Sequence, residues 1–475
     1  MSMKILYAAS EALPFIASGG LADVAGSLPR ALQKEGVECR VVLPLYGSMK
    51  ASLREKLEYV THFNVPLSWR NQYCGLFRAE VDGVTCYLLD NEYYFKRDGI
   101  YGFYDDAERF VFFSKAVLEM LTVLDYEPEI INCNDWQTAM IPVFLNVFYR
   151  GVEKFRHIRT VFTIHNIQYQ GKYGMEIASD ICGLPGYAIP VVTYDGAVNM
   201  MKGAIEQCDM ISTVSPSYAQ EILDSWFGFG LDKILREKAY KLCGILNGID
   251  VVGYDPAADP DLFVNYTPKK PAGKAENKAK LQERLGLEVA PDKPLIVMVS
   301  RLVGMKGLDL VRYIFGELLG LGCQFAVLGT GDYIYENFFR EQAEANPGTV
   351  AFWQGFVPEL AHKMYAGGDI LLMPSKSEPC GLAQMVALRY GTIPVIRETG
   401  GLKDSIRDLG GEDGNGFTFQ TYNAHDMLGA LQRAVELYGD KKRWKAAVAH
   451  AMECDFSWES SAKKYIEMYQ RVLAG

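Results

Sequence analysis

Short runs of apolar residues alternate with longer segments of helical periodicity along most of the chain. The runs are rich in Val, Ile and Leu and show no clean alternation with polar residues, which is typical of strands buried on both faces. Because helical segments separate these strands, the pattern predicts right-handed βαβ units with parallel sheets, an α/β fold. In the first half, strands are expected at 5–9, 39–43, 85–89, 130–133, 160–164 and 210–214. In the second half, they are expected at 295–299, 325–328, 350–353, 370–373, 393–396 and 416–419.

A proline-rich connection separates the two series of strands. Residues 254–274 contain four prolines and few consecutive apolar positions, which indicates an irregular linker. We therefore expect one Rossmann-like domain over residues 1–250 and a second over residues 251–455. Ser457 is a plausible N-cap for a last helix within residues 456–475, which could pack back on the N-terminal domain.

The composition narrows the class of protein. The chain of 475 residues is 49% hydrophobic and 22% charged, as in ordinary globular proteins, which excludes a disordered chain or a fibre. The net charge of −10 argues against non-specific binding to nucleic acid, which needs a basic surface. The ten cysteines include no Cys-x-x-Cys pair, so neither a zinc ribbon nor a redox dithiol is indicated, and a reducing cytoplasm is expected. The sequence contains no run of 18 apolar residues, and we expect neither a signal peptide nor a membrane span.

Two similar glycine loops, one in each half, suggest an anion site. Residues 18–23 read Ser-Gly-Gly-Leu-Ala-Asp and residues 399–404 read Thr-Gly-Gly-Leu-Lys-Asp, and each segment follows a predicted strand and opens a helical pattern. Backbone N–H groups and the positive end of a helix dipole attract anions at such a place. One copy alone is more often a simple tight turn. Two copies indicate two similar domains that face one anionic ligand across a cleft.

Polar residues that could bind or react with a ligand follow two strands of the second half. Arg301 and Lys306, after the strand at 295–299, suit a diphosphate, or else are solvated surface cations. Glu378 stands in the turn before the next helix, where it could accept sugar hydroxyls or simply favour the helix dipole. Cys380 has no base near it in the sequence, so we expect it to pack rather than to react.

In the first half, Asp135 and His165 each come within two residues of the end of a predicted strand, at the edge where α/β sheets bind ligands. His165 reads equally well as a structural residue, and Asp135 is more commonly explained as a helix N-cap. The six histidines show no metal-like spacing. The chain has no P-loop, so the sequence does not indicate a P-loop kinase or ATPase. Ile334 occupies the third glycine position of the one partial Gly-x-Gly-x-x-Gly, which argues against a nicotinamide-dependent oxidoreductase.

As a set, these motifs resemble bacterial glycogen synthases and plant starch synthases nearly from end to end. Each motif is a modest signal, and the ordered series is highly specific. The segments that carry the resemblance are 19–24, 134–136, 163–166, 213–218, 246–250, 273–278, 300–302, 306–307, 378–382 and 399–402.

The resemblance implies a retaining glucosyltransferase of the GT-B architecture, with two Rossmann-like domains whose parallel sheets face each other across a cleft. Such an enzyme transfers glucose from a nucleotide-glucose donor, usually ADP-glucose, to the non-reducing end of an α-1,4-glucan such as glycogen or a maltooligosaccharide. The N-terminal domain is then the acceptor side with the glucose pocket, and the C-terminal domain binds the nucleotide sugar. The resemblance implies no cofactor and no metal, because the nucleotide sugar is a substrate.

The resemblance also implies roles for individual residues. Arg301 and Lys306 would hold the diphosphate and stabilise the leaving nucleotide, Glu378 would hold glucose hydroxyls, and Asp135 and His165 would line the glucose pocket. Further substrate contacts are implied for Gly19, Gly20, Asp23, Asn166, Asn247, Phe356 (against the base), Cys380, Gly381, Leu382, Thr399 and Gly400.

One position departs from the family pattern. The family usually carries a lysine before the first glycine loop, and here Ala17 stands in its place, which removes a cation expected near the donor. An ADP-glucose-dependent synthase is the leading hypothesis, with a UDP-glucose-using transferase and a non-catalytic glucan-binding homologue as alternatives. Many relatives with this architecture carry a second glutamate at the position of Val386, and its absence is typical of the synthase branch.

Overall fold

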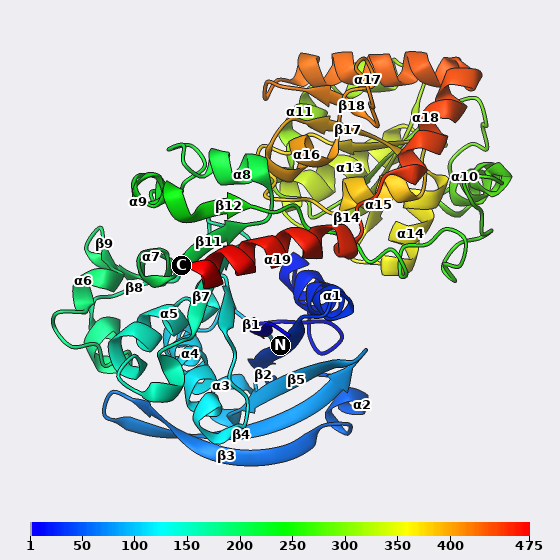
Figure 1. The fold of residues 1–475 in the computed structure, drawn as a ribbon. Coiled ribbons are helices and arrows are strands. Elements are labelled where there is room, and N and C mark those ends of the chain that lie inside the picture. Colours follow the sequence, from blue (N-terminus) through cyan, green and yellow to red (C-terminus); the bar gives the residue numbers. More distant parts are fainter. Residues whose placement is uncertain (1) are drawn as a thin grey trace. The chain divides into compact units, whose positions relative to one another are not determined.

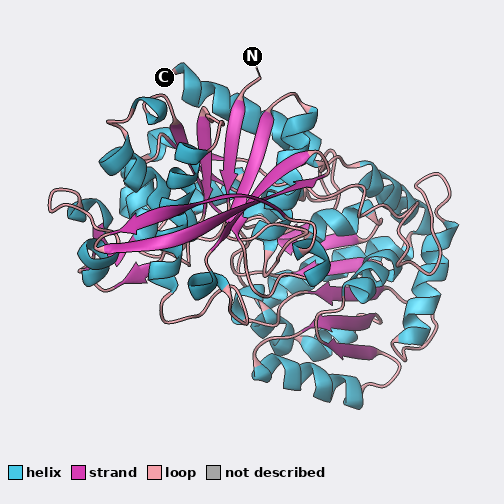
Figure 2. Ribbon diagram, turned by 90° about the horizontal axis from the view of Figure 1, so that it is seen from below, coloured by secondary structure: helices cyan, strands magenta, loops and turns pink. Residues whose placement is uncertain are grey.

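The computed structural model describes residues 2–475 and divides them into two compact units (Figure 1). Among the described residues, unit 1 comprises those up to 214, 219–248 and 458–475, and unit 2 comprises residues 215–218 and 249–457. Each unit has its own sheet with helices on both sides (Figure 2). No helix within residues 2–475 combines the length and the apolar character that crossing a membrane requires.

The larger sheet of unit 1 has a parallel core and an antiparallel edge. Its strand order is β12-β11-β7-β6-β1-β2-β5-β4-β3, with β3 and β4 antiparallel to their neighbours. The strands are β1 (Lys4–Ala8), β2 (Glu38–Pro44), β3 (Glu58–Leu67), β4 (Arg70–Val81), β5 (Val84–Asp90), β6 (Ile130–Asn134), β7 (Arg159–Ile164), β11 (Met210–Thr213) and β12 (Leu242–Gly244). A small antiparallel sheet consists of β8 (Lys172–Tyr173), β9 (Thr193–Tyr194) and β10 (Ala197–Asn199).

Helices lie on both sides of the larger sheet. The α-helices of unit 1 are α1 (Gly20–Lys34), α2 (Ala51–Arg54), α3 (Glu92–Phe95), α4 (Asp106–Val123), α5 (Met140–Phe144), α6 (Ile189–Val192), α7 (Met200–Gln207), α9 (Asp232–Glu237) and α19 (Trp458–Ala474), and α8 (Pro216–Glu221) has residues in both units. Short helices are η1 (Trp136–Thr138), η2 (Leu145–Tyr149), η3 (Glu153–Phe155), η4 (Ile177–Ile181) and η5 (Ala239–Lys241).

The last helix, α19, belongs to the core of unit 1. It lies beside α1 (Figure 1), and the buried side chains of Trp458, Tyr465 and Tyr469 join a hydrophobic cluster that includes residues of β1 and β2. The Tyr469 hydroxyl donates a hydrogen bond of 3.0 Å to the side-chain oxygen of Asn132 in β6. The C-terminus therefore completes a domain that begins at the other end of the chain.

Unit 2 contains an all-parallel sheet in the order β15-β14-β13-β16-β17-β18, which is the 3-2-1-4-5-6 order of a Rossmann fold. Its strands are β13 (Leu295–Val299), β14 (Gln324–Gly329), β15 (Val350–Gln354), β16 (Ile370–Met373), β17 (Ile393–Arg397) and β18 (Phe417–Phe419). The helices are α10 (Ala272–Arg284), η6 (Gly304–Lys306), α11 (Leu308–Tyr313), α12 (Phe315–Leu319), α13 (Tyr333–Ala345), α14 (Pro358–Gly367), α15 (Ala383–Arg389), α16 (Gly400–Ser405), α17 (Ala424–Gly439) and α18 (Lys441–Glu453).

The prediction of an α/β fold with parallel sheets is confirmed, and every predicted strand is present with its ends shifted by at most one residue. The long β3–β4 hairpin at the sheet edge was not predicted (Figure 2). Strand β3 is largely exposed and carries polar residues, so it lacks the continuous apolar run by which buried parallel strands are identified.

Candidate functional site

The candidate residues follow strands at the carboxyl edges of both sheets, and those after β1, β6, β13 and β16 lie next to the point where the strand order reverses. In unit 1, β1 pairs with β2 on one side and with β6 on the other. In unit 2, β13 likewise pairs with β14 on one side and with β16 on the other. Open α/β sheets bind ligands in the crevice at this switch point, because the loops that follow the two central strands diverge there.

In unit 1, the glycine loop after β1 is held by a buried carboxylate. Gly19 is the N-cap of α1, Gly20 is its first residue, and Asp23 lies in its first turn. The Glu11 carboxylate, 3% exposed, accepts hydrogen bonds from the backbone N–H groups of Ser18 and Gly19. Burial raises the pKa of Glu11, and these hydrogen bonds oppose that rise. The N–H groups of Ser18 and Gly19 are thus engaged within the protein, so the expected unblocked loop is in part already occupied.

Asp135, after β6, binds the backbone of the loop after β7. Its Oδ1 accepts a hydrogen bond of 2.8 Å from His165 N–H and a longer one of 3.4 Å from Asn166 N–H. Its side chain makes no capping hydrogen bond to the following helix, which decides against the simple N-cap interpretation. Its backbone adopts φ 55°, an unusual conformation for an aspartate, and such strain concentrates at functional sites. Burial raises the pKa of Asp135 to about 7.

The hydrogen bonds around His165 define its tautomer. The side-chain amide of Asn134 donates to the Ala8 carbonyl, so its Oδ1 is free to accept from the Tyr7 hydroxyl and from His165 Nε2, both at 2.9 Å. His165 Nε2 therefore carries the proton, and Nδ1 is the acceptor. Burial lowers the pKa of His165 to about 3, which keeps the ring neutral.

Asn247 follows β12 at the same edge of the sheet. It is 5% exposed, and its Oδ1 has no hydrogen-bond partner among the residues that the structure describes. A buried acceptor without a partner is costly, so its retention suggests that a ligand hydroxyl or amine satisfies it.

In unit 2, the switch point brings Lys306 and Glu378 together. The Lys306 ammonium lies 2.6 Å from Glu378 Oε2, and the Ser375 hydroxyl donates to the same oxygen at 2.9 Å. Both charged side chains are largely shielded, with 19% of Lys306 and 10% of Glu378 exposed. Arg301, in the loop after β13, is exposed to solvent. The arrangement is a cationic loop beside a carboxylate. The main partner of Glu378 is the Lys306 ammonium rather than the helix dipole.

The loops around this pair approach each other too closely for side chains. Gly307 has φ 73°, and a Cβ there would lie 2.0 Å from the carbonyl oxygen of Pro374. Gly400 has φ 43°, and a Cβ there would lie 2.1 Å from the carbonyl oxygen of Glu378. Glycine at these positions lets the loops after β13, β16 and β17 pack together and fixes the backbone around the cation.

The remaining candidates of unit 2 lie on the same edge. Thr399, buried, is the N-cap of α16, and Cys380 and Gly381 precede α15 with Leu382 as its N-cap. Phe356 follows β15, two strands away from β13, and its ring is 88% exposed.

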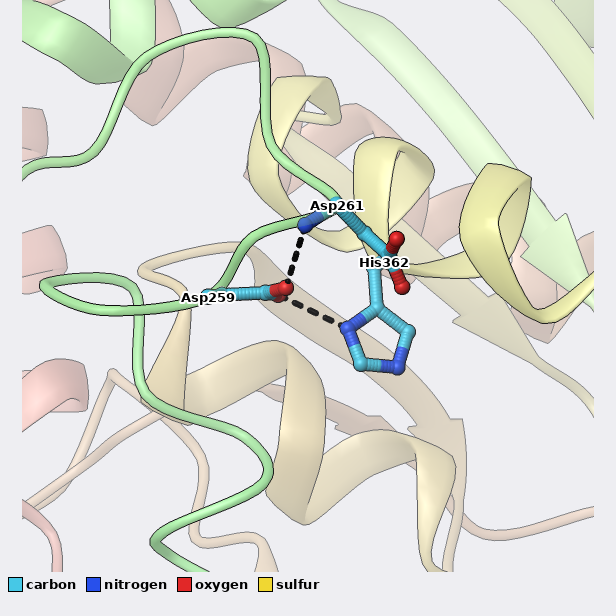
Figure 3. Close-up of side chains that lie close together, drawn as sticks. All are labelled: Asp259, Asp261 and His362. Atoms are coloured by element: carbon cyan, nitrogen blue, oxygen red, sulfur yellow. Dashed lines mark hydrogen bonds and ion pairs between the residues drawn. The ribbon is translucent and has the colours of Figure 1, made fainter.

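A second cluster in unit 2 could hold a metal ion by geometry. Asp259, Asp261 and His362 bring their ligand atoms within 4.8 Å of one another. Figure 3 shows that Asp259 already binds His362 Nδ1, at 2.7 Å, and the backbone N–H of Asp261, at 2.9 Å. The Tyr390 hydroxyl donates to Asp259 as well. Because its carboxylate is satisfied by protein donors, we interpret the cluster as structural.

Sequence reasoning missed Glu11 and Ser375 as members of the two sites. Glu11 lies two residues after the predicted strand at 5–9, as Asp135 lies two residues after the one at 130–133, and this position was the available signal. Ser375 gives no sequence signal of its own, because serine is common in loops.

Known proteins resemble the chain over its full length. A family described as "Starch synthase catalytic domain" matches residues 4–237, and one described as "Glycosyl transferases group 1" matches residues 280–450. Glycogen synthase of Desulforamulus reducens is 48% identical, and that of Exiguobacterium sibiricum is 47% identical, with each alignment covering 99% of both chains. The catalytic domain of starch synthase IV from Arabidopsis thaliana, solved bound to ADP and acarbose, superposes with a TM-score of 0.92 at 34% identity, covering 100% of both chains.

The two Rossmann-like units, the polar residues at their switch points and these full-length similarities agree with one another. The resemblance seen in the sequence motifs is confirmed, and the chain belongs to the glycogen and starch synthase family of glycosyltransferases.

Proposed function

We propose that this protein transfers glucose, with retention, from ADP-glucose to the non-reducing end of an α-1,4-glucan. The structural observation that carries the proposal is the shielded Lys306–Glu378 pair at the switch point of a Rossmann fold, a site suited to a diphosphate beside a sugar. The family relationship supports a nucleotide sugar and a glucan as substrates. That the similar Arabidopsis domain was solved with ADP and acarbose supports ADP as the nucleotide.

In unit 2, the proposed role of Arg301 and Lys306 is to bind the diphosphate and to stabilise the negative charge that grows as it departs. Lys306 then exchanges Glu378 for phosphate oxygens. Glu378, held by Ser375, becomes available to accept hydrogen bonds from glucose hydroxyls. Backbone contacts to the substrate are proposed for Gly381, Leu382, Thr399 and Gly400. Phe356 is proposed to stack on the base.

In unit 1, Asp135 and His165 are proposed to line the glucose pocket. The neutral His165 presents Nδ1 as an acceptor, which suits a sugar hydroxyl. The buried oxygen of Asn247 is a second acceptor. Gly20, Asp23 and Asn166 remain candidates for further substrate contacts.

In the proposed reaction, the bond between glucose C1 and the phosphate oxygen breaks. The acceptor 4-hydroxyl oxygen bonds to C1 on the same face, and its proton passes to the departing phosphate oxygen. The products are ADP and a glucan longer by one glucose. Since cationic side chains are proposed to stabilise the leaving group, the reaction as proposed uses no resident metal or cofactor.

We propose a cytoplasmic location, because every cysteine in residues 2–475 is a free thiol, as a reducing compartment would maintain. The acidic net charge of −10 supports a small-molecule and glucan partnership rather than one with nucleic acid. A membrane partner is not part of the proposal.

The test is to incubate the purified protein with glycogen and a panel of nucleotide-glucose donors, and to measure nucleotide release and glucan chain length. ADP release with chain extension is expected to be fastest with ADP-glucose. Preference for UDP-glucose would assign the alternative donor, which the exposed Ala17 leaves possible. If no donor reacts and only Ala17→Lys restores turnover, the wild-type protein is a glucan-binding homologue. No nucleotide release from either protein would refute the proposal.

A further inference from the structure

Unit 2 contains a cavity that no part of the proposed reaction uses. It has a volume of about 650 Å³, within the usual range for small-molecule sites, and lies between α10 and α18. Asp369 at its base directly precedes β16 and accepts a hydrogen bond from the N–H of Leu295, the first residue of β13. The cavity is therefore at the amino edge of the sheet, opposite the edge that carries Lys306 and Glu378.

The interior of this α10–α18 pocket is apolar. Ala275 of α10 and Trp444, Val448 and Met452 of α18 are among its lining side chains. Two lysines also reach it, and both are already satisfied. The ammonium of Lys274 donates to three protein oxygens, and that of Lys278 pairs with Asp369 at 2.7 Å and donates to further oxygens. Protein oxygens therefore engage both ammonium groups. Gln282 also lines the cavity, with a buried Oε1 that has no partner among the described residues, and the rest of the interior is mainly apolar and suits a hydrocarbon body.

The rim, in contrast, is cationic. Lys441 and Lys445 line it from α18 and are exposed, and the rim carries one exposed carboxylate, Asp292, 4.0 Å from Lys441. The Lys441 ammonium lies 3.7 Å from the centre of the Tyr438 ring, so its stem follows the pocket wall.

The position of these charges on α18 is unfavourable for the helix itself. Residues 441–445 carry four cations at the N-terminus of the helix, where the dipole disfavours positive charge. The whole chain has a net charge of −10, so this local excess is not a general property of the surface. The Asp440 carboxylate caps this end and accepts a hydrogen bond of 3.1 Å from Arg443 N–H, so it offsets part of the positive charge. An anion bound at the rim would compensate the remaining cations and their mutual repulsion.

We infer that the α10–α18 pocket is a binding site for an amphipathic anion, a long-chain carboxylate whose hydrocarbon body fills the apolar interior and whose head pairs with Lys441 and Lys445. Nucleotides and sugars fit less well, since they bring many hydrogen-bonding groups to a wall whose lysines are already engaged. The inference does not depend on the proposed glucosyl transfer.

The test uses the full-length protein and dodecanoate below its micelle-forming concentration, with binding followed by isothermal titration calorimetry. Saturable binding of one dodecanoate per chain is expected. Dodecanol, which lacks the charge, and butyrate, which lacks the body, should each bind at least roughly tenfold more weakly. Equal binding of dodecanol, or no saturable binding of dodecanoate, would overturn the inference.

Variants locate the site. The rim variant Lys441→Glu/Lys445→Glu should weaken dodecanoate binding by roughly tenfold or more, whereas Lys442→Glu, on the same helix turn but outside the lining, should leave it unchanged. Ala275→Trp, which fills the interior, should abolish binding. Because that variant could fail to fold, circular dichroism accompanies it, and the exposed rim variants test the site independently. If the rim and Lys442 variants behave alike, dodecanoate binds elsewhere and the inference is wrong.

Discussion

Replacing Lys306 with methionine is the sharpest test of the proposed phosphate site. Methionine keeps most of the apolar stem and removes the ammonium that lies 2.6 Å from Glu378 Oε2. If this ammonium transfers to the diphosphate in the transition state, its loss removes one preorganised charge-assisted contact to the leaving group. Contacts of this kind are worth about 3–4 kcal/mol, so kcat for glucosyl transfer should fall by roughly 10²–10³-fold.

The same change also affects the free protein, because Glu378 loses its main partner. The carboxylate, 10% exposed, would keep only the Ser375 hydroxyl among the contacts described above, and leaving a buried acceptor partly unsatisfied costs about 1–3 kcal/mol of stability. A fall in activity could therefore reflect a weakened fold. The double variant Lys306→Met/Glu378→Gln separates the two effects, since a neutral amide at 378 no longer needs a cation.

The assay measures ADP release at saturating ADP-glucose and glycogen, together with the urea midpoint of each protein. The double variant should recover much of the stability and none of the kcat, and the Glu378→Gln single variant should bind the sugar more weakly. If Lys306→Met keeps kcat within about threefold of the wild type, the ammonium contributes less than about 1 kcal/mol to the transition state, and the proposed role of this loop is wrong.

Three further changes probe the framework of the sites. Burial raises the pKa of Asp135 from 3.8 to about 7, so between these values the native state holds a proton that the unfolded chain has lost, and the stability of the wild type falls as pH rises. The urea midpoint of Asp135→Asn minus that of the wild type should therefore increase between about pH 4 and about pH 8. A difference that stays constant with pH would contradict this account. Gly307→Ala should destabilise unit 2 by about 1–3 kcal/mol and raise the KM for the donor, whereas Gly316→Ala, at an open helical position, should be neutral or stabilising in the same unfolding assay. Tyr469→Phe removes the buried hydrogen bond to Asn132 and should cost about 1–3 kcal/mol by urea unfolding, and a loss below about 0.5 kcal/mol would show that α19 does not depend on it.

The sequence was most informative where one short segment carries a complete signal. Continuous apolar runs predicted the buried parallel strands, and polar residues directly after them predicted Asp135, His165 and Arg301 at the ligand edge. What could not be predicted depends on pairs of distant residues. Lys306 and Glu378 meet only because β13 and β16 are neighbours at the switch point, and sequence alone does not give that order.

The helical spacing of α19 is a second case in which the sequence predicts an element but not its distant partner. The pattern predicts an amphipathic helix, but the partner of its apolar face is a set of strands at the opposite end of the chain. Glu11 was missed for a related reason. Its function is to hold the backbone of Ser18 and Gly19, and backbone partners leave no trace in residue types.

The switch point of unit 2 carries positive charge and that of unit 1 carries carboxyl groups, and this difference indicates which unit binds which part of the donor. In unit 2, Arg301 and Lys306 outnumber Glu378, so the loops after β13 and β16 carry a net positive charge. In unit 1, the corresponding loops carry Glu11 and Asp135 with a neutral His165, and burial raises the pKa of both carboxyl groups. A diphosphate is stabilised by the first environment and repelled by the second, whereas uncharged sugar hydroxyls can donate to buried carboxylates and to His165 Nδ1. We therefore infer that unit 2 binds the nucleotide diphosphate and that unit 1 binds sugar. A donor truncated to ADP should accordingly lose affinity in Arg301→Ala and keep it in Asp135→Asn, and the reverse result would exchange the two assignments.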